Sequence, residues 1–454
     1  MMRAFLSAVA VSVLGLTGTV ASAETLADAL AAAYKNSKLL DQNEALLRAA
    51  DEDVARAVAR LRPVINFVAE AQNTDLDPDG PSNDEFTTTL TLAMQWTLLD
   101  FGRNRLGIEI AKESVLATRE ALKDLEAQVL LSAVSAYVEV GLQTEIVSLR
   151  QSNVRLITQE LQAAQDRFDV GEVTRTDVAI AEARLAAARS GLAAAEGDLK
   201  VARERYKAVV GAYPGNLSGL PPLPKTAQSM EEAQMIALRG HPDMLQAQRQ
   251  VTVARLGVEA TKAEMRPTVT VEGGISKSVD TSVRRDSLSV SFNQTLYAGG
   301  ALHSAHRAAL AQKEAAEAAL LQTTITVGEN VGNAWTALEV AGAAIDAGTL
   351  QVQAAQTAFD GVREEATLGA RTTLDVLNAE QELLDARATK LQAEAQRYIG
   401  VYSLLSSMGL LSVDHLNLGV PTYDPALYYN AVQNAPITSP QGKKLQRILD
   451  KIGD

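Results

Sequence analysis

The sequence of 454 residues contains no cysteine. This absence excludes disulfide bonds, zinc–thiolate sites, iron–sulfur clusters, cysteine nucleophiles and attachment to a membrane through a lipidated cysteine. Basic residues are also few, since 42 Lys and Arg stand against 55 Asp and Glu and give a formal net charge of -13. Because nucleic-acid binding needs a basic surface that neutralises phosphates, the composition predicts no nucleic-acid partner.

Long hydrophobic runs are missing beyond the N-terminus. Residues 5–20 are mostly apolar, follow a single positive charge at Arg3 and precede Ala21-Ser22-Ala23, an A-x-A cleavage pattern. The pattern predicts a secretory signal peptide over residues 1–23. The alternative is an N-terminal membrane anchor, which needs about 20 apolar residues. Because no later stretch has this length, the exported chain could enter a membrane only as β-strands.

Proline is absent from residues 82–213 and 268–420, and these two tracts lie in two similar halves. Residues 26–63 align with 230–267 at an offset of 204, and residues 98–211 align with 296–409 at an offset of 198. Conserved pairs include Pro63/Pro267, Gly102/Gly300, Gly171/Gly369, Asp177/Asp375 and Arg189/Arg387. We therefore expect a first repeat at 24–211, a proline-rich linker at 212–229, a second repeat at 230–411 and an extension at 412–454.

The proline-free tracts predict long helices. Apolar residues recur every seven, three or four positions along 104–168, and a second helix at 176–210 follows the glycine at Gly171. The earlier helix at 38–61 and the helix at 176–210 together nearly match the length of 104–168. We therefore expect each half to form a long antiparallel helical hairpin with a glycine at its tip, beside a stacked second column.

Short alternating segments lie between the helices, at 64–72, 86–98, 269–277 and 287–296. Leu90, Leu92, Met94, Trp96 and Leu98 share one face of the second segment, opposite small and polar residues. This pattern is typical of transmembrane β-barrels, although amphipathic strands over a soluble core would show it too. Four strands cannot close a barrel with a lumen, whereas three copies of the chain would supply twelve strands and twelve helical columns. Another copy number remains open.

The sequence resembles the TolC family of outer-membrane channels at the motifs that join these elements. Each repeat ends its second strand in Leu98-Leu99-Asp100-Phe101-Gly102-Arg103 or Leu296-Tyr297-Ala298-Gly299-Gly300, and residues 170–178 and 368–377 repeat one glycine-turn motif. The resemblance implies a homotrimer with a 12-stranded outer-membrane β-barrel, embedded in outer-membrane lipid, and a periplasmic 12-helix barrel. It also implies an exit duct for drug efflux or type I secretion, which docks on an inner-membrane transporter through a periplasmic adaptor protein.

The same resemblance identifies candidate site residues at the two helical tips. The residues expected to contact the adaptor are Val170, Gly171, Glu172, Val173, Leu368, Gly369, Ala370 and Arg371. Asp375 matches a ring of aspartates at the constriction, Asn378 replaces a second acidic residue, and Asp177 and Arg371 match positions that tie neighbouring hairpins together. A simpler interpretation is that Asp177 and Asp375 are solvated charges favoured by the helix dipole.

No catalytic constellation is visible, so we expect no enzymatic activity and no cofactor. His303 and His306 lie three residues apart but lack a third ligand at useful spacing, so we predict no metal site there. The alternative function is an exported coiled-coil structural or adhesion protein without a pore. A charge on the apolar strand face, such as Leu92→Arg, would separate the two hypotheses, because it would impair only a barrel.

Overall fold

A computed structural model describes residues 23–75, 84–280, 283–433 and 447 of the chain. The predicted signal peptide, apart from its last residue, and residues 434–446 and 448–454 of the predicted extension lie outside this part. The first repeat contains α1 (Leu26–Asn36), α2 (Lys38–Ala59), β1 (Val64–Asp75), β2 (Asp84–Leu99), α3 (Arg103–Asp169) and α4 (Arg175–Val210). The second contains α5 (Met230–Gly240), α6 (Pro242–Glu264), β3 (Thr268–Ser278), β4 (Arg284–Asn293), α7 (Ala301–Thr367) and α8 (Thr373–Ser407), and α9 (Pro425–Val432) follows.

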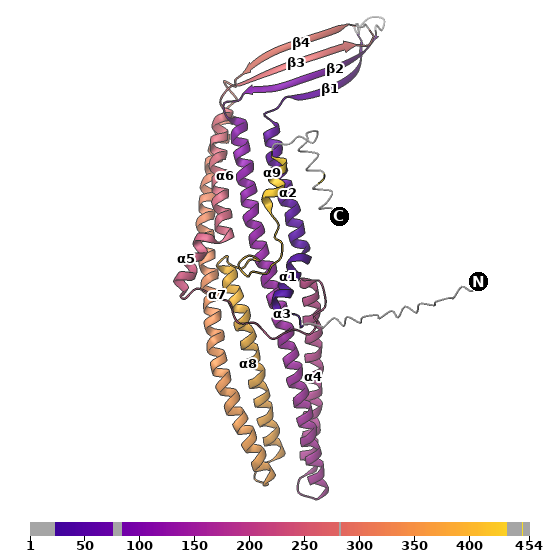
Figure 1. Ribbon diagram of the computed structural model, residues 1–454, viewed down its shortest axis with the longest axis vertical. Helices are drawn as coiled ribbons and strands as arrows, with labels where there is room; N and C mark the ends of the chain where they lie inside the picture. Colours follow the sequence, from indigo (N-terminus) through magenta and orange to yellow (C-terminus); the bar gives the residue numbers. More distant parts are fainter. Residues whose placement is uncertain (1–22, 76–83, 281–282, 434–446, 448–454) are drawn as a thin grey trace, which may run out of the picture.

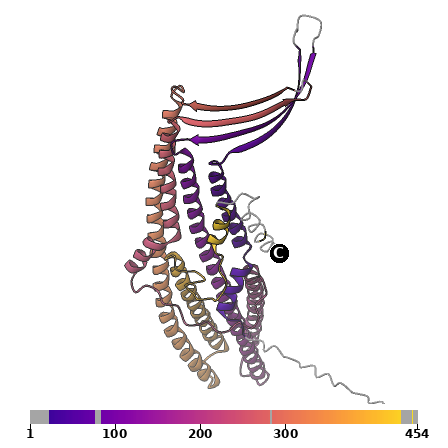
Figure 2. The same ribbon diagram turned by 45° about the horizontal axis from the view of Figure 1, so that its top comes forward.

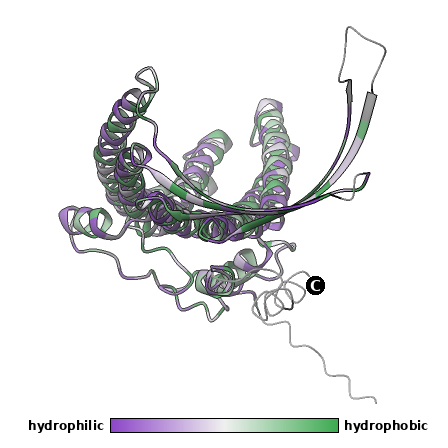
Figure 3. Cartoon of the chain, turned by 90° about the horizontal axis from the view of Figure 1, so that it is seen from above, coloured by the Kyte–Doolittle hydropathy of each residue, from purple (hydrophilic) through white to green (hydrophobic). Residues whose placement is uncertain are grey.

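The chain is elongated, with the four strands at one end and the two helical tips at the other (Figure 1). Turning the molecule shows the sheet leaning away from the top of the helices (Figure 2). Seen from above, the sheet follows an arc (Figure 3). The helical hairpins and the four strands confirm the predicted mixture of long helices and barrel-type strands, except that β4 ends at Asn293 rather than at residue 296.

The four strands form one antiparallel sheet in the order β1-β2-β3-β4. Phe67 pairs with Leu92, which pairs with Ile275, so these three side chains share one face. They are 69%, 49% and 45% exposed, respectively. Within the described residues, β1 and β4 each pair on one side only, which leaves two open edges. The predicted apolar face is therefore present and uncovered in one chain.

The shorter helices stack end to end along the two long ones, as predicted from their lengths. The junction in the first repeat is tight: Asn36 Nδ2 donates to the Val210 carbonyl at 2.7 Å, and a Cβ on Gly211 would lie 2.8 Å from the same nitrogen. In the second repeat a Cβ on Gly409 would lie 2.8 Å from the Cα of His241. Both glycines have positive φ, +97° and +72°, so each helix ends where only glycine fits without strain.

The largest core lies at mid-height, where α1, α3, α4 and α8 meet the proline-rich linker. Tyr137 and Tyr206 are buried there, and both bind Glu24: the Tyr137 hydroxyl donates to its carbonyl at 2.9 Å, and the Tyr206 hydroxyl donates to Oε1 at 2.6 Å. Helix α3 also contains the one described window long and apolar enough to cross a membrane, but that window is 50% buried. We therefore assign its apolar residues to this core.

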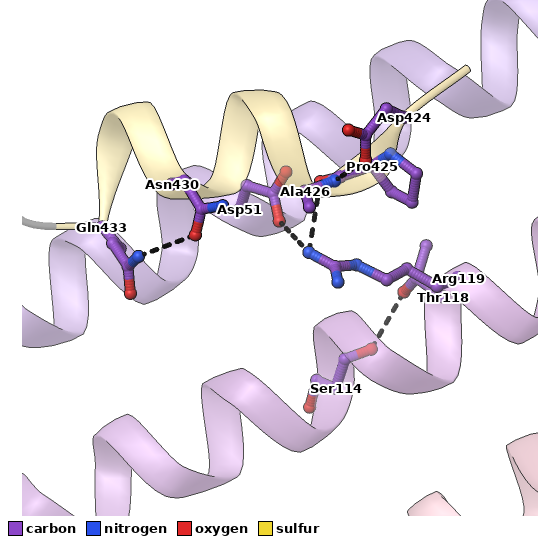
Figure 4. A network of polar contacts seen from close by, with 9 residues as sticks. All are labelled: Asp51, Ser114, Thr118, Arg119, Asp424, Pro425, Ala426, Asn430 and Gln433. Carbon is purple, nitrogen blue, oxygen red and sulfur yellow. Dashed lines mark hydrogen bonds and ion pairs between the residues drawn. The ribbon is translucent and has the colours of Figure 1, made fainter. Parts of the chain in front are cut away.

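The extension covers the first repeat, with α9 lying beside α2 and α3 (Figure 4). Arg119 on α3 donates to the Pro425 carbonyl at 3.2 Å, lies 3.9 Å from Asp51 Oδ1 and stacks on the Tyr429 ring at 5.1 Å. Burial raises the pKa of the fully buried Asp51 to about 6, and the Arg119 charge opposes this shift. The extension thus packs on the outside of the helical column.

Candidate functional site at the helical tips

Each helical tip is a glycine turn built from backbone hydrogen bonds. In the first tip Gly171 has a φ of +80°, and the Glu172 N–H donates to the Arg167 carbonyl at 2.9 Å. In the second tip Gly369 has a φ of +81°, and the Ala370 N–H donates to the Glu365 carbonyl at 2.9 Å. This is the Schellman geometry, in which a left-handed glycine satisfies the last carbonyls of a helix.

The residue after each turn begins the returning helix with a capping box. Thr174 caps α4, and the Asp177 carboxylate accepts from the Thr174 N–H at 2.9 Å and from its hydroxyl at 2.8 Å. Thr372 and Asp375 repeat this arrangement in α8, at 3.0 and 2.8 Å. These hydrogen bonds lower the pKa of both aspartates, so both are ionised at neutral pH. Asp177 and Asp375 therefore stabilise the starts of their helices, as the simpler interpretation of these charges expects.

The two tips face each other across one cleft of about 770 Å³. Glu172, Asp177 and Arg371 line it together with both turn segments. Within the chain, Arg371 Nε donates to Glu365 Oε2 at 2.7 Å, whereas the Asp177 carboxylate accepts from its own cap residue, Thr174. The predicted Asp177 and Arg371 therefore share a cleft, but each has a local partner in a single chain.

Exposed apolar side chains mark the ends of the tips. Val170 is 72% exposed and Leu368 is 80% exposed, at equivalent positions of the two repeats. Exposed apolar residues at equivalent places on two rigid turns make a surface that another protein can bind.

A polar layer joins the two hairpins above the tips. Asn153 Nδ2 on α3 donates to Glu380 Oε1 on α8 at 2.6 Å, and both residues are buried. Arg184 on α4 donates to the Asn378 amide oxygen on α8 at 2.8 Å. Asn378 is thus hydrogen-bonded to the neighbouring hairpin of its own chain.

Glu380 is the least expected residue in this layer. It is 4% exposed, and Oε2 has no hydrogen-bond partner among the residues that the structure describes. Burial raises its pKa to about 7; the Asn153 bond opposes the shift, while the nearby Glu160 charge adds to it. Glu380 is not among the site residues predicted from the sequence, although a glutamate within the apolar spacing of a helix is a signal for a buried carboxyl group.

The fold and the paired tips define an outer-membrane channel protein built from helical hairpins and barrel strands. The family described as "Outer membrane efflux protein" matches residues 29–212 and 235–410, and the chain belongs to that family. The outer membrane efflux protein BepC of Brucella suis biovar 1 (strain 1330) is 35% identical over 92% of both chains.

Two further relatives extend the comparison. The alkaline protease secretion protein AprF of Pseudomonas aeruginosa is 26% identical over 65% of this chain and 64% of its own. A solved structure of CusC superposes with a TM-score of 0.75 at 18% identity, covering 84% of this chain and 91% of that one. The resemblance to the TolC family is confirmed.

The family confirms the main functional prediction. The chain is an outer-membrane exit duct, a passive conduit with a long periplasmic extension, and its family is one of channels. The alternative of a pore-free coiled-coil protein is set aside, because the family and the fold are both those of a channel.

Proposed function

We propose that three copies of this chain assemble into one duct that joins an inner-membrane transporter to the cell exterior through a periplasmic adaptor protein. The observation that carries the proposal is the open sheet, which lies at the opposite end from the two tips and whose two edge strands lack a second partner among the described residues. Unpaired strand edges are not stable in lipid, so the edges must pair with other copies. Three copies give an even count of twelve strands, with room for a lumen.

The proposed duct uses two repeats, at 24–211 and 230–411, as equivalent wall units. Leu217 and Leu223 of the linker at 212–229 pack against the mid-height core, and residues 412–433 of the extension would lie on the outer surface near that level. Supporting this division, α3 and α7 each contain 67 residues and begin 198 positions apart.

The adaptor is proposed to bind the tips at residues 170–173 and 368–371. The exposed Val170 and Leu368 would be covered by apolar residues of the adaptor, while the fixed glycine turns would set the docking angle. Because the two tips are alike, two sites per chain would be available to the adaptor.

The gate is proposed to use the charges at the same level. Asp375 would face the axis three times per trimer, with Asn378 in place of a second acidic ring. Asp177 and Arg371 would tie adjacent hairpins across the cleft between the tips, once Arg371 exchanges its Glu365 partner. Like charges brought close around an axis attract cations, so the entrance would favour cations.

The clasp can be tested by single-channel conductance in planar bilayers. We expect Arg371→Ala and Asp177→Asn to raise the conductance of the closed duct several-fold, because each removes one charge of the clasp. Thr174→Ala is the matched control, since it removes a cap hydroxyl near Asp177 but keeps the charge. Unchanged conductance in both charge variants, or an equal rise in Thr174→Ala, would reject the clasp.

We propose drug efflux as the first role of the duct, since the relative at 35% identity is named an efflux protein. Type I secretion is the second candidate, supported by the similarity to a protease secretion protein. Deletion of the gene is expected to increase drug sensitivity, and the wild-type gene should restore resistance. Loss of secreted proteins with unchanged drug sensitivity would instead assign the duct to secretion.

A further inference from the structure

A cluster of metal-ligating side chains lies at mid-height, far from the tips. Asp124 on α3 and His241 and Asp243 at the start of α6 each offer a ligand atom, and the three atoms lie within 4.8 Å of one another. His241 is buried, with 7% of its surface exposed, and His241 Nδ1 is 3.7 Å from Asp243 Oδ2. We propose that these residues bind one divalent transition-metal ion, of which Zn²⁺ is the best fit.

The charges of the cluster suit a divalent ion. A neutral imidazole and two carboxylates carry a charge of about -2, which one such ion would neutralise. Among the described residues, neither carboxylate forms an ion pair with a lysine or arginine. One imidazole nitrogen and two carboxylate oxygens form a donor set that Zn²⁺ accepts, with water in the fourth position.

Neighbouring residues hold the ligands in place. Gln128 Nε2, one turn along α3, donates to Asp124 Oδ2 at 2.6 Å and fixes that carboxylate. The backbone of His241 lies against Gly409, where a Cβ would come within 2.8 Å of the His241 Cα. Such outer partners orient metal ligands and raise affinity. The Asp243 side chain is 44% exposed, so solvent can reach this side of the cluster.

Two local features oppose binding. The Asp243 N–H donates to His241 Nδ1 at 3.1 Å, so an ion on that nitrogen would replace the N-cap hydrogen bond. The start of α6 also carries a partial positive charge of about +0.5. Because two full negative charges lie at the cluster, the attraction exceeds this repulsion.

A cavity adjoins the cluster on the side of Asp124. A cavity of about 620 Å³ is lined by Asp124, by Gly240 and Pro242 on either side of His241, and by Tyr423 of the extension. An ion could therefore approach Asp124 through this cavity in the folded chain.

The duplicated positions of the chain carry other residues. The positions equivalent to Asp124, His241 and Asp243 are Gln322, Ser37 and Leu39. Ser37 still caps its helix, accepting from the Leu40 N–H at 3.3 Å. The helix start therefore does not require the imidazole of His241, and neither Gln322 nor Leu39 offers a carboxylate.

The full-length channel, extracted in detergent and stripped of metal, tests the proposal with Co²⁺ as a visible probe and Zn²⁺ as competitor. We expect one Co²⁺ per chain, displaced by Zn²⁺. Bound Co²⁺ should give a visible absorption band. His241→Ser introduces the residue found at the equivalent position of the first repeat, and Asp124→Gln introduces the one found in the second repeat. Each variant should abolish the band. Gln128→Ala should weaken binding about 10- to 100-fold.

The exposed His303 provides the matched control, and His303→Gln should leave the titration unchanged. A wild-type protein without a Co²⁺ band would overturn the proposal. So would an unaltered band in both His241→Ser and Asp124→Gln, because the ion would then be bound elsewhere.

Discussion

The two repeats contain the same helices and strands, but the long helix of the first repeat is more deeply buried than that of the second. Helix α3 contains 17 buried residues and α7 contains nine, although both are 67 residues long. Helix α3 is packed by α1, α2, α4, α6 and α8, whereas α7 is packed by α5, α6 and α8. Leu321, Ile325 and Val340 on α7 are more than three-fifths exposed, at 67%, 62% and 63%.

The difference shows which contacts a single chain can satisfy. In α3 the face toward α8 is covered inside the chain, and the equivalent face of α7 would need α4 of another copy. Exposed apolar residues spaced along one long helix are a surface that association buries. The repeats are therefore alike at the sheet and at the tips, and unlike in the middle, where one of them lacks its neighbour.

The largest effect is expected at the sheet, where the repeats should behave alike. Leu92→Arg and the equivalent Val290→Arg each place a charge on the apolar face of the sheet. Each substitution should reduce the free energy of barrel stability by about 2–4 kcal/mol per chain if the residue lies at the membrane midplane. We expect both variants to lose most of the assembled channel from the outer-membrane fraction, measured by immunoblot of the undissociated oligomer.

Thr91→Arg is the control for these variants, because Thr91 faces the opposite, polar side of the same strand. It should assemble at near wild-type levels. Normal assembly of both apolar-face variants would contradict the membrane role of the sheet, and a defect in only one would show that the repeats are not equivalent there.

A smaller effect is expected in the polar layer above the tips, where the two repeats should differ. Glu380 is buried and its pKa is raised to about 7, whereas the equivalent Glu182 is exposed. A raised carboxyl pKa stabilises the folded state below the unfolded pKa of about 4.5, and this contribution is lost as the pH rises through about 7. Glu380→Gln should therefore raise the thermal midpoint at about pH 8 by a few degrees and leave it nearly unchanged at about pH 5.

The difference between variant and wild type isolates Glu380 from other titrating groups such as Asp51. Glu182→Gln is the matched control and should leave the midpoint unchanged at both pH values. An equal shift at the two pH values in Glu380→Gln would contradict the buried, proton-binding state of this side chain.

Much of the fold was predictable because the same glycines and prolines mark the ends of helices in both repeats. Gly171 and Gly369 end their helices as expected, and the lengths of the helices gave the end-to-end stacking. The strand ends were less predictable: β4 stops at Asn293, because the next residues turn toward Gly299 and Gly300, both of which have positive φ.

The candidate site was predicted only where the motif lies in one segment. The capping roles of Asp177 and Asp375 follow from Thr174 and Thr372 three residues earlier. The Asn153–Glu380 pair and the Asp124–His241–Asp243 cluster join residues more than 100 positions apart, so local spacing carried no signal for them. Their positions depend on how α3 packs on α8 and α6.

The stoichiometry of the assembled channel tests the central claim most directly. Native mass spectrometry of the detergent-extracted protein should give three chains per particle, since three four-stranded sheets close a barrel and cover the open face of α7. A particle of one or two chains would contradict the account, because the sheet edges and the apolar residues of α7 would then remain uncovered.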